Sequence, residues 1–91
     1  MFVIQTLSVF FRQKLYYYFM NYVDKLIALR QDRDLKQADI AKVLNRSRSS
    51  YANLENQRYK FNVDDIIKLC EYYNVSPEYV LGFTDEQKNL K

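Results

Sequence analysis

The chain has 91 residues, of which 48% are hydrophobic and 27% are charged, and its formal net charge at pH 7 is +3. A single hydrophobic core organises roughly 50 to 200 residues, so we expect one domain. One glycine, one cysteine and no histidine exclude an internal disulfide and argue against a glycine-rich phosphate loop, an ordinary zinc site and histidine-based acid–base catalysis. We therefore expect a protein without enzymatic activity, metal ion or cofactor.

The first predicted element is an apolar extension, residues 1–19. Its apolar residues fit one face of a helix: Val3, Leu7, Phe10, Phe11, Leu15 and Tyr18. Arg12 and Lys14 interrupt it well before the roughly 20 apolar residues of a membrane span, and no positive region or small-residue cleavage site marks a signal peptide. Two interpretations stay open. The extension is an additional helix that packs on the domain or pairs with a second copy, or translation starts at Met20.

Residues 21–33 predict an amphipathic helix. Val23, Leu26 and Ile27 recur at three- and four-residue spacing, and Lys25 is one of the polar residues between them. We therefore expect Lys25 on the solvent side of this helix.

A second and a third helix follow, with a short turn between them. The second begins near Lys36, and Asn45 follows its last apolar residue, as Asn does where a helix ends in a left-handed conformation. Ser47 has the position of an N-cap for the third helix. The inward residues of these two helices are Ile40, Ala41, Leu44, Tyr51 and Leu54.

A basic stretch without helical periodicity, residues 57–62, predicts a loop before two further helices. Asn62 as N-cap starts the fourth helix, whose inner face is predicted to be Ile66, Ile67, Leu69, Cys70 and Tyr73. Ser76 followed by Pro77 starts the fifth, and Gly82 ends it. Its apolar side is predicted to be Tyr79, Val80 and Leu81. The predicted organisation is an extension over residues 1–19, a domain over 20–84 and a polar tail over 85–91.

The positive charge is concentrated over the predicted second and third helices and the loop. Residues 36–60 carry six basic and two acidic side chains, and residues 61–91 carry three basic and six acidic ones. Such segregation is typical of a protein with one face for a polyanion, although chance segregation on an ordinary surface gives the same counts.

A helix, a short turn and a second helix over residues 36–57 match the arrangement in which the second helix enters the DNA major groove. The residues that carry a more specific likeness are Gln37, Ile40-Ala41, Leu44-Asn45, Ser47 and Leu54-Glu55-Asn56. On these residues, and on the segment from Ile67 to Gly82, the chain resembles the Cro and lambda-repressor-like family, also called the Xre family. The resemblance covers about residues 22–83. It implies an all-α fold, a compact five-helix lambda-repressor-like DNA-binding domain, with an extra N-terminal helix if residues 1–19 form one.

The resemblance implies a sequence-specific, repressor-like transcriptional regulator whose recognition helix is about residues 47–56. Arg pairs with guanine and Asn with adenine, so we expect base reading by Arg48, Ser49, Ser50 and Asn53. We expect phosphate contacts from Gln37, Arg46, Arg58 and Lys60. Arg30 and Glu55 occupy positions that form a structural ion pair in relatives. For the predicted base-reading residues the alternative is an ordinary solvated polar face. For Arg30 and Glu55 the alternative is two independent surface charges.

The implied partners are a double-stranded DNA operator, near-palindromic, and a second copy of the chain. The implied location is the cytoplasm of a bacterium or of a phage-infected cell, on the nucleoid when DNA is bound. The alternative function is an antitoxin-like or anti-repressor module that uses the same fold to bind a protein. Attachment to a membrane surface through residues 1–19 is a weaker third interpretation, and we expect no membrane partner.

The chain departs from the family at two positions. Relatives usually cap the second helix with Ser or Thr, where this chain has Lys36, so we expect a weaker start or a cap borrowed from Asp34. Relatives often have Gly where this chain has Gln57, and we expect Asn56 to take the left-handed conformation instead.

Overall fold

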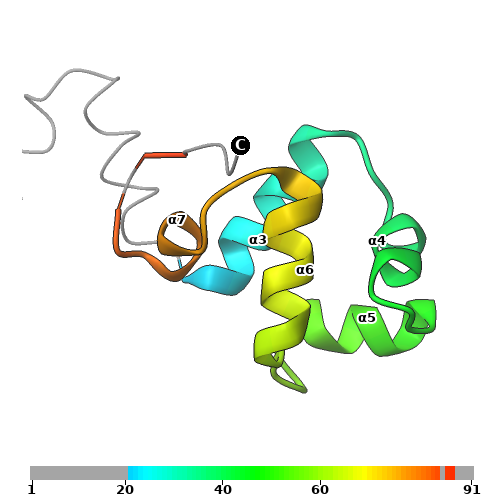
Figure 1. Ribbon diagram of the computed structural model, residues 1–91. Coiled ribbons are helices and arrows are strands. Elements are labelled where there is room, and N and C mark those ends of the chain that lie inside the picture. The colour runs from blue at the N-terminus through cyan, green and yellow to red at the C-terminus, as the bar shows by residue number, and fades with distance from the viewer. Residues whose placement is uncertain (1–20, 85, 88–91) are drawn as a thin grey trace, which may run out of the picture.

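A computed structural model describes residues 21–84, 86 and 87 and contains five α-helices, without a strand, in this part of the chain. The helices are α3 (Tyr22–Asp32), α4 (Gln37–Val43), α5 (Arg48–Glu55), α6 (Val63–Tyr73) and α7 (Pro77–Leu81). Figure 1 shows α6 upright at the centre with α3 behind it, α4 and α5 toward one side and α7 toward the other. The structure confirms the predicted all-α class. The extension over residues 1–19 and most of the polar tail lie outside the described residues.

Four of the five helices begin with a side-chain cap, because an Asn or Ser accepts the backbone N–H three residues later. The donor-to-acceptor distances are 2.8 Å at Asn21, 3.1 Å at Ser47, 2.7 Å at Asn62 and 3.2 Å at Ser76. Each such cap stabilises a helix by about 1 kcal/mol. The predicted starts at Ser47, Asn62 and Ser76 are confirmed.

The exception is α4, which begins after Lys36. A lysine side chain cannot accept a hydrogen bond, and of the two expected outcomes, a weaker start or a cap borrowed from Asp34, the structure does not show the Asp34 cap. Instead, the Asp39 carboxylate accepts the backbone N–H of Lys36 at 2.8 Å, which is the reverse half of a capping box. Asp34 itself has a φ of +55° in the link between α3 and α4.

A residue with left-handed backbone lies at the end, or one residue beyond the end cap, of α4, α5, α6 and α7. The φ angles are +56° at Asn45, +62° at Gln57, +58° at Asn74 and +91° at Gly82. The ends predicted at Asn45 and Gly82 are confirmed. The expectation for Asn56 is wrong, since Asn56 has a φ of −77° and the following Gln57 turns left-handed.

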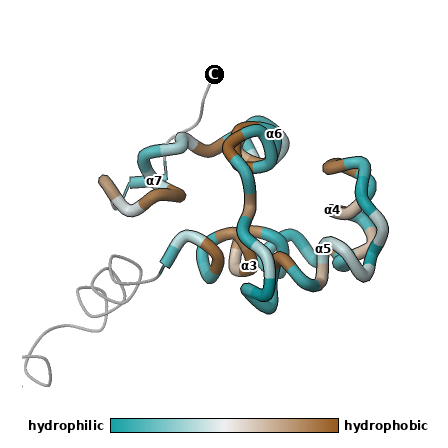
Figure 2. Tube along the Cα trace, turned by 90° about the horizontal axis from the view of Figure 1, so that it is seen from below, coloured by the Kyte–Doolittle hydropathy of each residue, from teal (hydrophilic) through white to brown (hydrophobic). Residues whose placement is uncertain are grey.

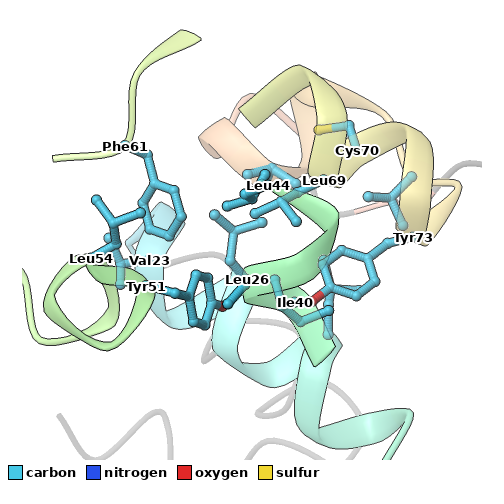
Figure 3. Packing of buried hydrophobic residues seen from close by; sticks show 14 of the residues in the cluster. Val23, Leu26, Ile40, Leu44, Tyr51, Leu54, Phe61, Leu69, Cys70 and Tyr73 are labelled. Atoms are coloured by element: carbon cyan, nitrogen blue, oxygen red, sulfur yellow. The ribbon is translucent and has the colours of Figure 1, made fainter. Parts of the chain in front are cut away.

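The core lies where α3, α4, α5 and α6 meet. Figure 3 shows side chains from all four helices converging with Phe61 of the loop before α6. Cys70 is buried with them, and burial raises the pKa of its thiol above the ordinary value. Figure 2, seen from below, shows hydrophobic and hydrophilic stretches following one another along α3 and α6, as expected of helices that bury one face.

Two apolar residues predicted for the core are exposed. Ile67 is 45% exposed and Leu81 is 47% exposed. The inner stripe of α6 runs through Ile66, Leu69, Cys70 and Tyr73, at the spacing of one helix face, and Ile67 lies one step of about 100° beyond it. Leu81 is the last residue of a five-residue helix whose inner side Tyr79 and Val80 already fill.

Lys25 shows the opposite error, because its side chain is buried between α3 and α7. The Lys25 Nζ donates to the Tyr79 carbonyl oxygen at 3.0 Å and lies 5.2 Å from the centre of the Tyr79 ring. Burial lowers the pKa of this lysine below its ordinary value. The long aliphatic stem fills space between the helices while the ammonium group finds an oxygen.

Candidate nucleic-acid interface

The helix-turn-helix consists of α4, the turn over residues 44–47 and α5. The turn is closed by two backbone hydrogen bonds, from Asn45 N to Lys42 O at 3.1 Å and from Arg46 N to Ala41 O at 2.8 Å. Ala41 is 2% exposed, and a larger side chain there would force the two helices apart. Ser47 caps α5 and so fixes where the second helix begins.

The inward register of α5 determines which of its side chains remain accessible. Tyr51 and Leu54 are buried in the core. Of the four predicted base-reading residues, Arg48 and Ser49 are exposed, and Ser50 and Asn53 are half-buried. The structure therefore places all four on α5 with part or all of their surface accessible, where guanidinium, hydroxyl and amide groups suit the edges of bases.

Glu55, at the end of α5, is the centre of a buried polar network. Arg30 of α3 donates to it twice, from Nε to Oε2 at 2.8 Å and from Nη2 to Oε1 at 3.1 Å. Gln37 of α4 donates to Oε1 at 2.9 Å, and the Tyr51 hydroxyl donates to Oε2. The side chains of Arg30 and Glu55 are only 12% and 5% exposed. One carboxylate thus fixes α3 and α4 relative to α5.

The network changes the acidity of its members. Burial alone would raise the pKa of Glu55, but the hydrogen bonds from Arg30, Tyr51 and Gln37 together lower it below the ordinary value. The hydrogen bond to Glu55 raises the pKa of Arg30. Burial, and then the hydrogen bond to Glu55, raises the pKa of Tyr51. The pair is therefore ionised at neutral pH, and Tyr51 remains a donor.

The four residues predicted to contact phosphate differ in their surroundings. Arg58 and Lys60 are exposed in the loop after α5. Gln37 gives one amide hydrogen to Glu55, which leaves the second one for another acceptor. Arg46 is not a free cation, because its Nη2 lies 2.8 Å from Oδ2 of Asp65 at the start of α6.

The loop that carries Arg58 and Lys60 is anchored by Phe61, which is 7% exposed. Its ring meets the rings of Tyr22 and Tyr51 edge-on, with centroids 6.1 Å and 6.3 Å apart. At the other end of the loop, the carbonyl oxygen of Asn53 accepts the backbone N–H of Arg58 at 3.0 Å. The two cations are therefore held beside the end of α5.

Sequence reasoning missed three members of this assembly. Tyr51 was predicted as a core residue only, although its position one turn before Glu55 places the two side chains on the same helix face. Asp65 was not predicted as a partner of Arg46, to which it is joined at 2.8 Å. Phe61 was not predicted to be buried, and an apolar residue inside a polar loop is the signal that could have identified it.

Comparisons with known proteins agree with this geometry. A family model described as helix-turn-helix matches residues 26–80, which include parts or all of the five helices. The uncharacterized HTH-type transcriptional regulator YobD of Bacillus subtilis (strain 168) is 34% identical to the chain over 76 residues, which cover 77% of this chain and 68% of YobD. No solved structure matches the chain significantly.

Proposed function

The chain belongs to the Xre and lambda-repressor-like helix-turn-helix family, and on this premise we propose that it is a sequence-specific, repressor-like transcriptional regulator that places α5 in the major groove of double-stranded DNA. The observation that carries the proposal is the accessible polar face of α5, a helix that the buried Glu55 network fixes relative to α3 and α4 and that the cationic loop directly follows. Base contacts on such a face supply specificity, and the loop cations supply phosphate contacts that fix the register. DNA binding of this kind fits a protein of the bacterial cytoplasm.

We propose that two copies bind one operator. The eight residues of α5 span about 12 Å, so one helix reaches only a few base pairs. Two half-sites about 34 Å apart, related by a two-fold axis, are the usual way for such a protein to gain affinity and specificity. A near-palindromic operator follows from that symmetry.

Selection of bound sequences from random double-stranded DNA at physiological salt tests the proposed function. An enriched inverted repeat supports a dimeric DNA reader. Without enrichment, and with an affinity that vanishes as salt rises, the binding is only electrostatic and the proposal fails. The second candidate function is then a protein-interaction module, which the exposed Val63 and Ile67 on the outer side of α6 favour.

Asn53→Ala is expected to reduce discrimination between the selected operator and random DNA by about 1–3 kcal/mol, because an Asn can donate to and accept from one adenine. The measurement is the ratio of the two dissociation constants. Gln31→Ala, which removes an exposed amide from α3, is the control and is expected to leave the ratio unchanged. An equal loss of affinity for both DNAs would remove Asn53 from the base-reading set, and Arg48→Ala applies the same test to Arg48.

Lys60→Ala is expected to weaken binding to all DNA sequences alike, because a lysine in the loop contacts phosphate and not bases. The slope of log K against log salt should become shallower by about 0.9, the contribution of one phosphate contact. Lys68→Ala removes the same charge from an exposed position on α6 and should leave the slope as it is. A change in sequence preference on Lys60→Ala would contradict this assignment.

A further inference from the structure

Arg46 lies in the turn directly before the proposed recognition helix, yet its guanidinium is turned to α6. Its Nη2 donates to Oδ2 of Asp65 at 2.8 Å. The side chain of Arg46 is 30% exposed and that of Asp65 only 7%. The Nε of Arg46 is shielded from solvent and has no hydrogen-bond partner. The cation is thus committed to the protein at some cost in solvation.

Asp65 connects this cation to the loop that ends at Asn62. Its Oδ2 also accepts the backbone N–H of Asn62 at 3.3 Å, and its own backbone N–H donates to the side chain of Asn62 at 2.7 Å. Arg46 precedes α5, and Asn62 ends the loop that follows α5. The Asp65 carboxylate therefore contacts both ends of the segment that contains α5, Arg58 and Lys60.

If Arg46 turned to a DNA phosphate, the nearly buried Asp65 carboxylate would lose its cation. It would keep only its hydrogen bond from the Asn62 N–H. A buried carboxylate without its cation is strongly unfavourable. Arg58 and Lys60 are exposed, so they can contact a phosphate without leaving a buried carboxylate behind. A phosphate contact from Arg46 would therefore contribute much less binding free energy than one from Arg58 or Lys60.

We propose that Arg46 is a positioning residue and not a phosphate ligand: its ion pair with Asp65 holds α5 and the cationic loop in one fixed geometry, and this geometry contributes to discrimination between operator and random DNA. The inference rests on the proposed DNA-binding function and changes the expected role of Arg46 within it. Discrimination suffers when the pair is broken, because base contacts need the fixed geometry more than phosphate contacts do.

The first test is the salt dependence of Arg46→Ala on random DNA. Removal of a phosphate ligand makes the slope of log K against log salt shallower by about 0.9, and Lys60→Ala provides that reference in the same assay. We expect Arg46→Ala to keep the wild-type slope. A slope that changes as much as that of Lys60→Ala would overturn the inference.

The second test compares Asp65→Asn with Asp64→Asn. Both variants remove one negative charge from the first turn of α6, Asp64 is exposed, and an asparagine at position 65 keeps an oxygen for the Asn62 N–H. We expect Asp65→Asn to lower the ratio of operator to random affinity about 3- to 10-fold relative to Asp64→Asn, a usual size for coupling between contacting residues. A merely structural role would lower both affinities in parallel. Equal ratios in the two variants would refute the inference.

Two outcomes must be kept apart. If the wild-type protein enriches no operator, the proposed function fails and the inference fails with it. If the wild-type protein enriches an operator and either test above gives the opposite result, only the role of Arg46 is wrong. Thermal unfolding of each variant shows that the folded protein is being assayed, and Asp65→Asn decides the question alone if Arg46→Ala does not fold.

Discussion

Glu55→Ala is expected to lower the free energy of unfolding by about 3–5 kcal/mol, because it leaves the Arg30 guanidinium buried without its carboxylate. The truncation also removes the acceptor of Tyr51 and Gln37, whose donors lie in the same network. Denaturant titration measures the loss. The stability of a domain is typically 5–15 kcal/mol, so the variant would be close to unfolding at moderate temperature.

A double-mutant cycle shows whether the loss comes from the pair. Arg30→Met removes the charge while keeping an unbranched side chain, and we expect Glu55→Ala to cost much less in the Arg30→Met background than in the wild type. Additive losses would mean that Arg30 and Glu55 are energetically independent, despite the 2.8 Å contact between Nε and Oε2.

Acid gives a second readout of the same group. The folded state lowers the pKa of Glu55 below its ordinary 4.5, so the unfolded chain takes up this proton more readily than the folded protein. The contribution of Glu55 is therefore complete above about pH 4.5 and is lost as pH falls through the lowered pKa. We expect Glu55→Gln to be less stable at neutral pH and to lose less stability on acidification than the wild type.

Phe61→Ala is expected to destabilise the protein by about 3–5 kcal/mol, the usual cost of truncating a buried phenylalanine. Phe61 anchors the loop of Arg58 and Lys60 against Tyr22 and Tyr51, so DNA affinity should fall further than the loss of folded protein explains. Stability is measured by denaturant titration, and affinity is measured under conditions in which the variant is folded.

Tyr59→Ala is the matched control for Phe61→Ala. Tyr59 is an aromatic residue in the same loop but is 64% exposed, and truncation of an exposed side chain usually changes stability by less than about 0.5 kcal/mol. If the two variants lose similar stability, Phe61 does not anchor the loop. If Phe61→Ala loses stability but binds DNA with wild-type affinity when folded, the loop geometry does not matter for binding.

The features that sequence reasoning predicted correctly depend on neighbouring residues. A cap such as Ser47 or Asn62 bonds to a backbone N–H three residues away, so the short segment itself determines the start of the helix. The exposure of Arg48 on α5 follows from the register of Tyr51 and Leu54 in the same helix. These properties can be predicted from one segment at a time.

The features that sequence reasoning missed depend on packing between segments that are distant in the chain. Lys25 is buried because α7 lies against its side of α3, 54 residues later in the chain. Arg46 finds its partner 19 residues away on α6. Whether Ile67 is buried depends on how much of the circumference of α6 the core covers. No local pattern determines which residue of another helix will lie opposite such a side chain.

The burial of Cys70, the one cysteine of the chain, offers a practical advantage. A thiol that is 1% exposed and whose pKa is raised by burial reacts slowly with maleimides, which require an accessible thiolate. A second cysteine placed at an exposed position such as Tyr59 can therefore carry a fluorophore selectively in the native protein, with Cys70 left in place. Such a label beside the cationic loop would report DNA encounter in real time by fluorescence, without a change to the core.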